Sequence, residues 1–293
     1  MLHCFCWCVA SPLLPEYILD ADIKKELENS NPVQLQRMRI QADQGIEASQ
    51  YQLGLAYLYG ANGIHKDLNE ARLWFKKAAL QGSSRAQTNL GILYSMETTN
   101  LNEAQSWFKQ AIQRDDSNID AKWMLGRLLY DAMELDSAAH WFQEASNQGS
   151  VKGHFYLGIM YEYGLGGLPV DFRKSLQLYT AASSGDSNAR YYAGLQILYG
   201  RGTKQDFTVA GRMISSAAHA GIPEAMLTLG KLYTHGQGVE MDYRLALGWF
   251  ARVMQYASEG SEVYQRALAS QLELQSLVDM SDTKMFEKIK SYL

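Results

Sequence analysis

Residues 48–82 read ASQYQLGLAYLYGANGIHKDLNEARLWFKKAALQG, and this stretch determines the expected fold. Leu53, Gly54 and Tyr57 are spaced i, i+1 and i+4, which places them on one face of a helix. The motif Ala-x-x-Trp-Phe, which begins at Ala71, lies in a second apolar stretch that ends at Gly82. A glycine-containing loop separates the two. The stretch therefore predicts a pair of helices joined by a loop.

The same pattern recurs along most of the chain. A Leu-Gly pair, replaced once by Ala-Gly, returns every 32 to 37 residues, with its glycine at Gly54, Gly91, Gly126, Gly158, Gly194 and Gly230. Ala-x-x-Trp-Phe returns in step with it, with its tryptophan at Trp74, Trp107, Trp141 and Trp249. Two motifs in register at such a period indicate a repeat protein, so we expect six helix pairs over residues 46–257. We expect both sets of residues to be structural, with the Trp-Phe pairs in the core.

The glycines have two expected roles. A glycine inside a helix costs about 1 kcal/mol relative to alanine, so its return in six units indicates close approach of the partner helix. Between the helices, Gly-x-Gly sequences such as Gly164-Leu-Gly166 and Gly200-Arg-Gly202 resemble a phosphate-binding loop. Each of them ends a helix and does not follow a strand, so we interpret them as helix caps and turns. An aspartate follows the loop at Asp67, Asp171, Asp206 and Asp242, where it is expected to cap the next helix.

These motifs resemble the Sel-one-like repeat (SLR) family, a relative of the tetratricopeptide repeat (TPR) with a longer, glycine-containing loop. The second and third units have shorter loops, at 95–102 and 131–136, and are similar to plain TPR units. The tyrosine of the family pattern is Leu129 in the third unit and Ile197 in the fifth. The resemblance implies an all-α fold: an α/α right-handed superhelical solenoid of about six SLR/TPR-like helix-turn-helix repeats with helical caps. It also implies a scaffold for protein complexes without catalytic activity.

The flanking segments are expected to cap the solenoid, because its last hydrophobic faces need covering. In the N-terminal cap, residues 15–45, one helix is expected over Glu16–Glu28 and another from Pro32, with Asn31 as its N-cap. In the C-terminal cap, residues 258–293, we expect two helices, over Glu262–Val278 and Ser281–Leu293.

Residues 1–14 are expected to form a leader or an export signal. They are apolar, but no basic residue precedes Lys24, so the positive start of a signal peptide is missing. The expectation is an exported or cell-envelope protein, with the cytoplasm as the alternative. All three cysteines lie within the first eight residues, so no disulfide framework is expected in the repeats, and a metal clip there is the less favoured interpretation.

Composition and motifs argue against several classes of function. A net charge of −4 lacks the basic excess typical of nucleic-acid binders. No apolar run approaches the about 18 residues of a membrane-spanning helix. We find no catalytic signature and no metal-ligand spacing, and the pair Asp115-Asp116 falls in a turn where a solvated face is expected. The chain is therefore expected to be no enzyme, with no cofactor, no nucleic-acid partner and no integral membrane span.

The expected binding surface comes from the first helix of each unit, which lines the concave groove in the TPR family. By that analogy, groove positions lie three before, one after and four after the recurring glycine. From these we select Tyr51, Leu55, Trp123, Arg127, Tyr130, Phe155, Tyr191 and Lys231. Packing of the tyrosines against the neighbouring unit is the alternative. Trp123, Arg127 and Tyr130 depart most from the repeat pattern and are the first choice for a hot spot.

The expected function is a non-enzymatic protein-interaction scaffold or adaptor that binds a peptide or partner helix in this groove. The alternative is a rigid regulatory subunit of a cell-envelope or signalling machine.

Overall fold

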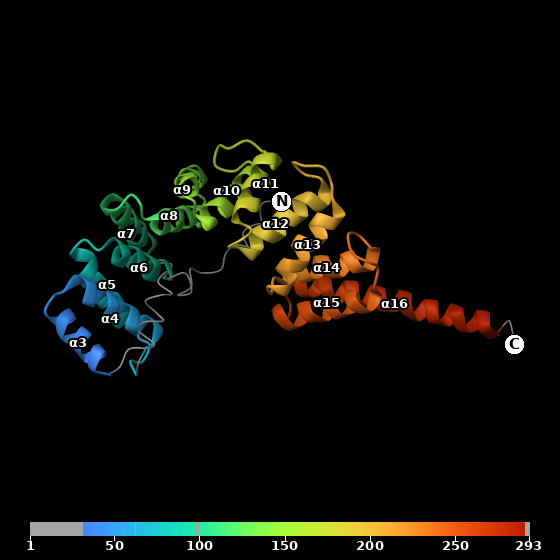
Figure 1. The fold of residues 1–293 in the computed structure, drawn as a ribbon, viewed down its shortest axis with the longest axis horizontal. Helices are drawn as coiled ribbons and strands as arrows, with labels where there is room; N and C mark the ends of the chain where they lie inside the picture. The colour runs from blue at the N-terminus through green and yellow to red at the C-terminus, as the bar shows by residue number, and fades with distance from the viewer. Residues whose placement is uncertain (1–31, 62, 98–99, 291–293) are drawn as a thin grey trace. The chain divides into compact units, whose positions relative to one another are not determined.

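The computed structural model describes residues 32–61, 63–97 and 100–290. The leader expected at residues 1–14 and the helix expected over Glu16–Glu28 lie outside these residues. Within the described ranges the regular elements are fourteen helices, α3 to α16, and no strand is found there (Figure 1). The all-α repeat fold predicted from the sequence is confirmed.

Twelve of the helices form six consecutive pairs. The first helices are α4 Glu47–Tyr59, α6 Ser84–Ser95, α8 Ile119–Asp131, α10 Val151–Tyr163, α12 Ser187–Tyr199 and α14 Pro223–His235. The second helices are α5 Leu68–Leu80, α7 Leu101–Arg114, α9 Leu135–Asn147, α11 Phe172–Ala182, α13 Phe207–His219 and α15 Tyr243–Tyr256. Before them lies α3 Pro32–Asp43, and after them α16 Glu262–Lys290.

The chain forms two compact units. Unit 1 comprises the described residues up to Tyr156 together with Leu165–Leu168. Unit 2 comprises Leu157–Gly164 and the described residues from Pro169 onward. In unit 1, α4 packs on α5, α6 on α7 and α8 on α9, and each pair also contacts the next. In unit 2 the same holds for α12 with α13 and α14 with α15, and α16 packs on both α14 and α15.

The recurring glycine lies directly against an aromatic ring of the second helix. A Cβ added at Gly54, Gly91, Gly126, Gly158 or Gly230 would lie 2.5 to 2.8 Å from a ring atom of Phe75, Phe108, Phe142, Tyr179 or Phe250 respectively. At Gly194 the nearest atom is Ile214 Cγ1, at 2.9 Å. The close approach predicted from the sequence is therefore present in every pair, and it explains why glycine recurs in mid-helix.

The tryptophans contribute less to the core than the sequence analysis predicts. Phe75, Phe108, Phe142 and Phe250 are fully buried, whereas Trp107 and Trp141 are only half-buried. Adjacent residues of a helix point about 100° apart, so only one of the Trp-Phe pair can face the glycine. Trp74 and Trp249 are buried but not fully. Lys77 Nζ lies 3.5 Å from the centre of the Trp74 ring.

The long loops have a common architecture. The predicted N-cap aspartates, Asp67, Asp171, Asp206 and Asp242, all accept hydrogen bonds from backbone N–H groups in the first turn of the next helix. Their own backbone N–H groups donate back to the first helix, to the carbonyls of Tyr57, Tyr161, Ile197 and Tyr233 at 2.9 to 3.3 Å. Each loop is thus closed at both ends, which satisfies backbone groups that the helix termini leave unpaired.

The C-terminal cap differs from its prediction. Where two helices were expected, over Glu262–Val278 and Ser281–Leu293, one continuous helix, α16, extends from Glu262 to Lys290. No glycine or proline interrupts these residues. The backbone hydrogen bonds therefore continue through Ser281, although serine is a good helix-capping residue.

Candidate functional site

The expected groove residues all lie on first helices, and most of them are buried. Lys231 of α14 is exposed. The other seven are buried: Tyr51, Leu55, Trp123, Arg127, Tyr130, Phe155 and Tyr191. Their side chains therefore contribute more to packing than to the free surface. Among the other positions of the same register, Ser95, Leu195 and Thr234 are half-buried, so three of the four accessible positions lie on α12 and α14.

Two of the three residues selected as a hot spot, Arg127 and Tyr130, form part of a connected cluster in unit 1. Arg127 Nε donates to both carboxylate oxygens of Asp131, at 2.8 and 3.0 Å, and Arg127 Nη1 donates to the Tyr156 hydroxyl at 2.6 Å. The Tyr130 ring lies 6.3 Å from both the Phe142 and the Tyr156 rings. Phe142 and Tyr156 stack at 4.9 Å. The cluster holds the guanidinium in one orientation.

The opposite charges of Arg127 and Asp131 stabilise each other. Burial opposes the charged form of Arg127, but the nearby Tyr156 and Asp131 hold the pKa of Arg127 above its ordinary value. Burial raises the pKa of Asp131, although Arg127 acts in the opposite direction. A buried guanidinium is tolerated only where hydrogen bonds and an opposite charge compensate its lost hydration. Asp131 was not among the sequence-predicted site residues, although its i+4 spacing from Arg127 is a recognisable signal.

Trp123, on the same helix, has a different neighbour. Its indole Nε1 donates to Asp120 Oδ1 at 3.1 Å, one turn earlier in α8. The structure therefore places Trp123, Arg127 and Tyr130 on one helix, where Arg127 and Tyr130 share Tyr156 as a neighbour and Trp123 bonds to Asp120.

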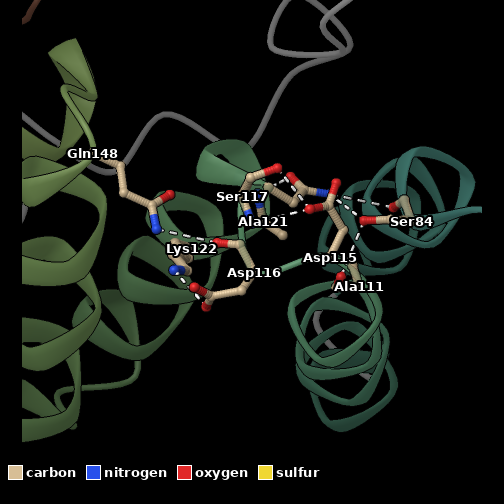
Figure 2. Close-up of polar contacts among 9 residues, drawn as sticks. Ser84, Ala111, Asp115, Asp116, Ser117, Ala121, Lys122 and Gln148 are labelled. Carbon is tan, nitrogen blue, oxygen red and sulfur yellow. Dashed lines mark hydrogen bonds and ion pairs between the residues drawn. The ribbon is translucent and has the colours of Figure 1, made fainter.

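The turn before α8 supplies a counter-charge to Lys122, a buried residue of α8 that was not among the sequence-predicted site residues (Figure 2). The Lys122 side chain is 1 % exposed, and its Nζ lies 2.8 Å from Asp116 Oδ1, which belongs to a side chain that is 84 % exposed. Asp115, also exposed, accepts hydrogen bonds from the Ser117 side chain and backbone, which lower its pKa. The solvated turn expected at Asp115-Asp116 is present, and Asp116 additionally neutralises Lys122.

The same turn is connected to both neighbouring helix pairs. Asn118 caps α8 through the Ala121 N–H and donates to Ser84 Oγ at 2.6 Å, while Gln148 Nε2 donates to the Asp116 carbonyl at 3.1 Å (Figure 2). Equivalent bonds join the end of each earlier second helix to the preceding turn, from Gln81 to the Gly45 carbonyl and from Arg114 to the Gly82 carbonyl. Along unit 1, a side chain from each second helix therefore fixes the stacking of adjacent pairs.

In unit 2, Tyr179 of the second helix α11 and Tyr191 of the first helix α12 are buried, and the hydroxyl of each makes a hydrogen bond. Tyr179 donates to Glu162 Oε2 at 2.8 Å, and burial, followed by the charge of Glu162, keeps the pKa of Tyr179 well above its ordinary value. The Tyr191 hydroxyl lies 3.1 Å from Thr228 Oγ1. Burial raises the pKa of Tyr191 to about 12.

The raised pKa of Tyr191 predicts a loss of stability in alkali. Between its ordinary value of 10.0 and about 12, the unfolded chain releases the phenolic proton while the folded chain keeps it, so the free energy of unfolding falls as pH rises. Two pH units correspond to about 3 kcal/mol. In urea denaturation, the stability advantage of the wild type over Tyr191→Phe should shrink by about that amount between pH 9 and pH 12.

Tyr243→Phe, which removes a hydroxyl from an exposed tyrosine of the same unit, is the control variant and is measured at the same pH values. A constant difference between wild type and Tyr191→Phe would contradict the assignment of the alkaline effect to this buried hydroxyl.

The described residues also bear on metal sites and on membrane spans. No group of three or more His, Cys, Asp or Glu side chains within the described ranges is arranged to hold a metal ion. Among the helices described there, none is long and apolar enough to cross a membrane.

Comparison with solved structures identifies similar solenoids. A Sel1 repeat protein from Oxalobacter formigenes is 28 % identical, with a TM-score of 0.66 over 80 % of this chain and 68 % of that chain. PilF of Pseudomonas aeruginosa is 17 % identical, with a TM-score of 0.59 over 78 % of this chain and 99 % of its own. Yeast Tom70 is 15 % identical, with a TM-score of 0.50 over 87 % of this chain and 61 % of its own. At these identities, the last two show a shared fold alone.

The sequence pattern of the Sel1 repeat matches residues 47–83, 84–116, 133–150, 151–187, 187–222 and 223–252. Residues 117–132, which contain Trp123, Arg127 and Tyr130, lie between matched stretches, in agreement with their departure from the repeat pattern. Repeats of this kind are generally protein-interaction scaffolds and typically non-catalytic. Because six matched stretches together span more than half of the sequence, the chain belongs to the Sel1 repeat family.

Proposed function

We propose that this protein is a non-enzymatic scaffold or adaptor that binds a peptide or partner helix along the surface of its first helices. The observation that carries the proposal is the rigid, hydrogen-bonded arrangement beneath that surface. Arg127 is held by Asp131 and Tyr156, and Tyr191 by Thr228. A surface ordered before binding loses less conformational entropy when a partner docks.

The eight groove residues have two roles in this proposal, according to whether their side chains are buried or accessible. The seven buried side chains hold the helices in position, and the partner contacts the accessible register positions above them. Leu195 and Lys231, on adjacent first helices of unit 2, combine an apolar contact with a cation. Such a pair suits a peptide that carries an apolar anchor beside an acidic residue.

The test is crosslinked affinity purification from the source organism with a double variant, Leu195→Asp with Lys231→Glu. The matched control is Leu73→Asp with Lys76→Glu, which changes the same residue types at exposed positions of the second helix α5. We expect wild type and control to capture a partner that the groove variant loses. Circular dichroism establishes that all three proteins are folded.

Retention of the partner by the groove variant would contradict binding at this surface. It would favour the alternative, a rigid regulatory subunit that contacts its machine through another face or through its ends.

A further inference from the structure

A pocket of about 390 Å³ lies in unit 2, between the second helix α13 and the loop that joins α14 to α15. The loop approaches the helix closely, since a Cβ added at Gly211 would lie 3.1 Å from the Gly238 carbonyl oxygen. The backbone of Gly238 and the side chain of Val239 form one wall. In Figure 1, α13, α14 and α15 lie next to one another in the C-terminal half of the chain.

Hydrogen-bond donors line the opposite wall. Arg212, Ser215, Ser216 and His219 follow the i, i+3, i+4, i+7 spacing of one helical face, and all four border the pocket. Ser216 Oγ accepts a hydrogen bond from Arg190 Nη1 at 3.0 Å, which leaves its own hydrogen available to donate. The Arg190 guanidinium is itself fixed on the Ser183 carbonyl, at 2.6 and 2.9 Å.

The charge of this pocket is positive. Arg212 is exposed and, among the described residues, makes neither an ion pair nor a hydrogen bond. The residues that border the pocket in the described part of the chain include no carboxylate. Glu240, the acidic residue that directly follows the pocket residue Val239 in sequence, borders a separate pocket. The Arg212 guanidinium and the hydroxyls of Ser215 and Ser216 therefore border the pocket together, and none of the described residues that border it carries a negative charge.

His219 adds one ring nitrogen to the donors and acceptors of the pocket. Its Nδ1 lies 2.8 Å from the Ser215 carbonyl, which can only accept, so Nδ1 carries a hydrogen and Nε2 is the atom left for a ligand. The ring is also held edge-on to Trp249 at 5.0 Å. At pH 7 a phosphate monoester carries a charge of about −1.5 to −2 and three strong acceptor oxygens, whereas a carboxylate carries one charge and two oxygens. A phosphate can therefore accept from more of the donors that border the pocket.

We propose that this pocket binds a phosphate monoester. Arg212 pairs with the phosphate oxygens, Ser215 and Ser216 donate their hydroxyl hydrogens, and His219 shares a proton with the remaining oxygen. The site is independent of the first-helix surface proposed to bind a peptide. The phosphate group can belong to a phosphorylated side chain or to a small phosphorylated compound, and the same donors recognise both.

Isothermal titration calorimetry of the full chain tests the site with three probes: inorganic phosphate, a capped peptide with one phosphoserine, and the same peptide with glutamate in place of phosphoserine. We expect both phosphates to bind wild type and the glutamate peptide to bind at least about tenfold more weakly. Arg212→Gln should weaken phosphate binding about tenfold or more, because it removes a charge-assisted hydrogen bond. Arg212→Lys should retain part of the affinity.

Arg244→Gln is the matched control, since Arg244 is exposed on α15 and does not border the pocket. It should change the Kd by less than about twofold. A phosphopeptide that binds much more tightly than inorganic phosphate supports a phosphorylated protein as the source, and equal binding supports a small compound. Absence of phosphate binding, equal binding of the glutamate peptide, or equal weakening by Arg212→Gln and Arg244→Gln would overturn the proposal.

Discussion

Gly238→Ala should lower the free energy of unfolding by about 4 kcal/mol, the largest effect we expect from a single methyl group in this protein. Gly238 has a φ of +71°, which L-residues rarely adopt. A Cβ there would lie 1.9 Å from the Phe207 carbonyl oxygen and 2.4 Å from its carbon. Since the obstacle is backbone at the start of α13, no rotation of a side chain relieves it.

The control for Gly238→Ala is Gly260→Ala in the same unit. Gly260 has a φ of +88° and no atom within 4 Å of an added Cβ, so alanine there introduces only the conformational strain, about 1 kcal/mol. Urea denaturation followed by circular dichroism measures both variants. Equal losses would show that the loop is not pressed against the preceding helix pair. Gly202 repeats the arrangement one pair earlier, with an added Cβ 2.4 Å from the Phe172 carbonyl oxygen.

Gly126→Leu should cost about 3 kcal/mol and lower the thermal midpoint by several degrees. A Cβ at Gly126 would lie 2.7 Å from Phe142 Cδ1 and 2.8 Å from its Cε1. The Phe142 ring cannot move aside cheaply, because it is fully buried and stacks on Tyr156. Leucine would therefore separate α8 from α9.

Gly248→Leu is the matched control for Gly126→Leu. Gly248 lies inside α15, is exposed and has no atom within 4 Å of an added Cβ. Leucine should stabilise the protein there by about 0.5 to 1 kcal/mol, because it favours the helix more than glycine does. An unchanged thermal midpoint for Gly126→Leu would contradict the packing account of the recurring glycine.

The candidate site was only partly predictable. The register of the recurring glycine correctly placed the selected residues on first helices, because a helix repeats its faces every 3.6 residues. The spacing contains no information on burial, and only Lys231 of the eight is exposed. The depth of a side chain depends on the helix that covers it. Asp131, one turn from Arg127, was recognisable in principle, whereas Tyr156, 29 residues later, was not.

What the sequence determined by itself is the repeat: the helix pairs, the glycine at each close approach, and the aspartate that caps each second helix after a long loop. These features depend on neighbours within about one helical turn or on a regular period, so they can be predicted from the amino-acid sequence alone. Only the tertiary structure decided that phenylalanine and not tryptophan meets the glycine, that Lys122 is neutralised by Asp116, and that the donors of α13 face a pocket. Those outcomes depend on how one helix pair stacks on the next, where side chains distant in sequence compete for the same space.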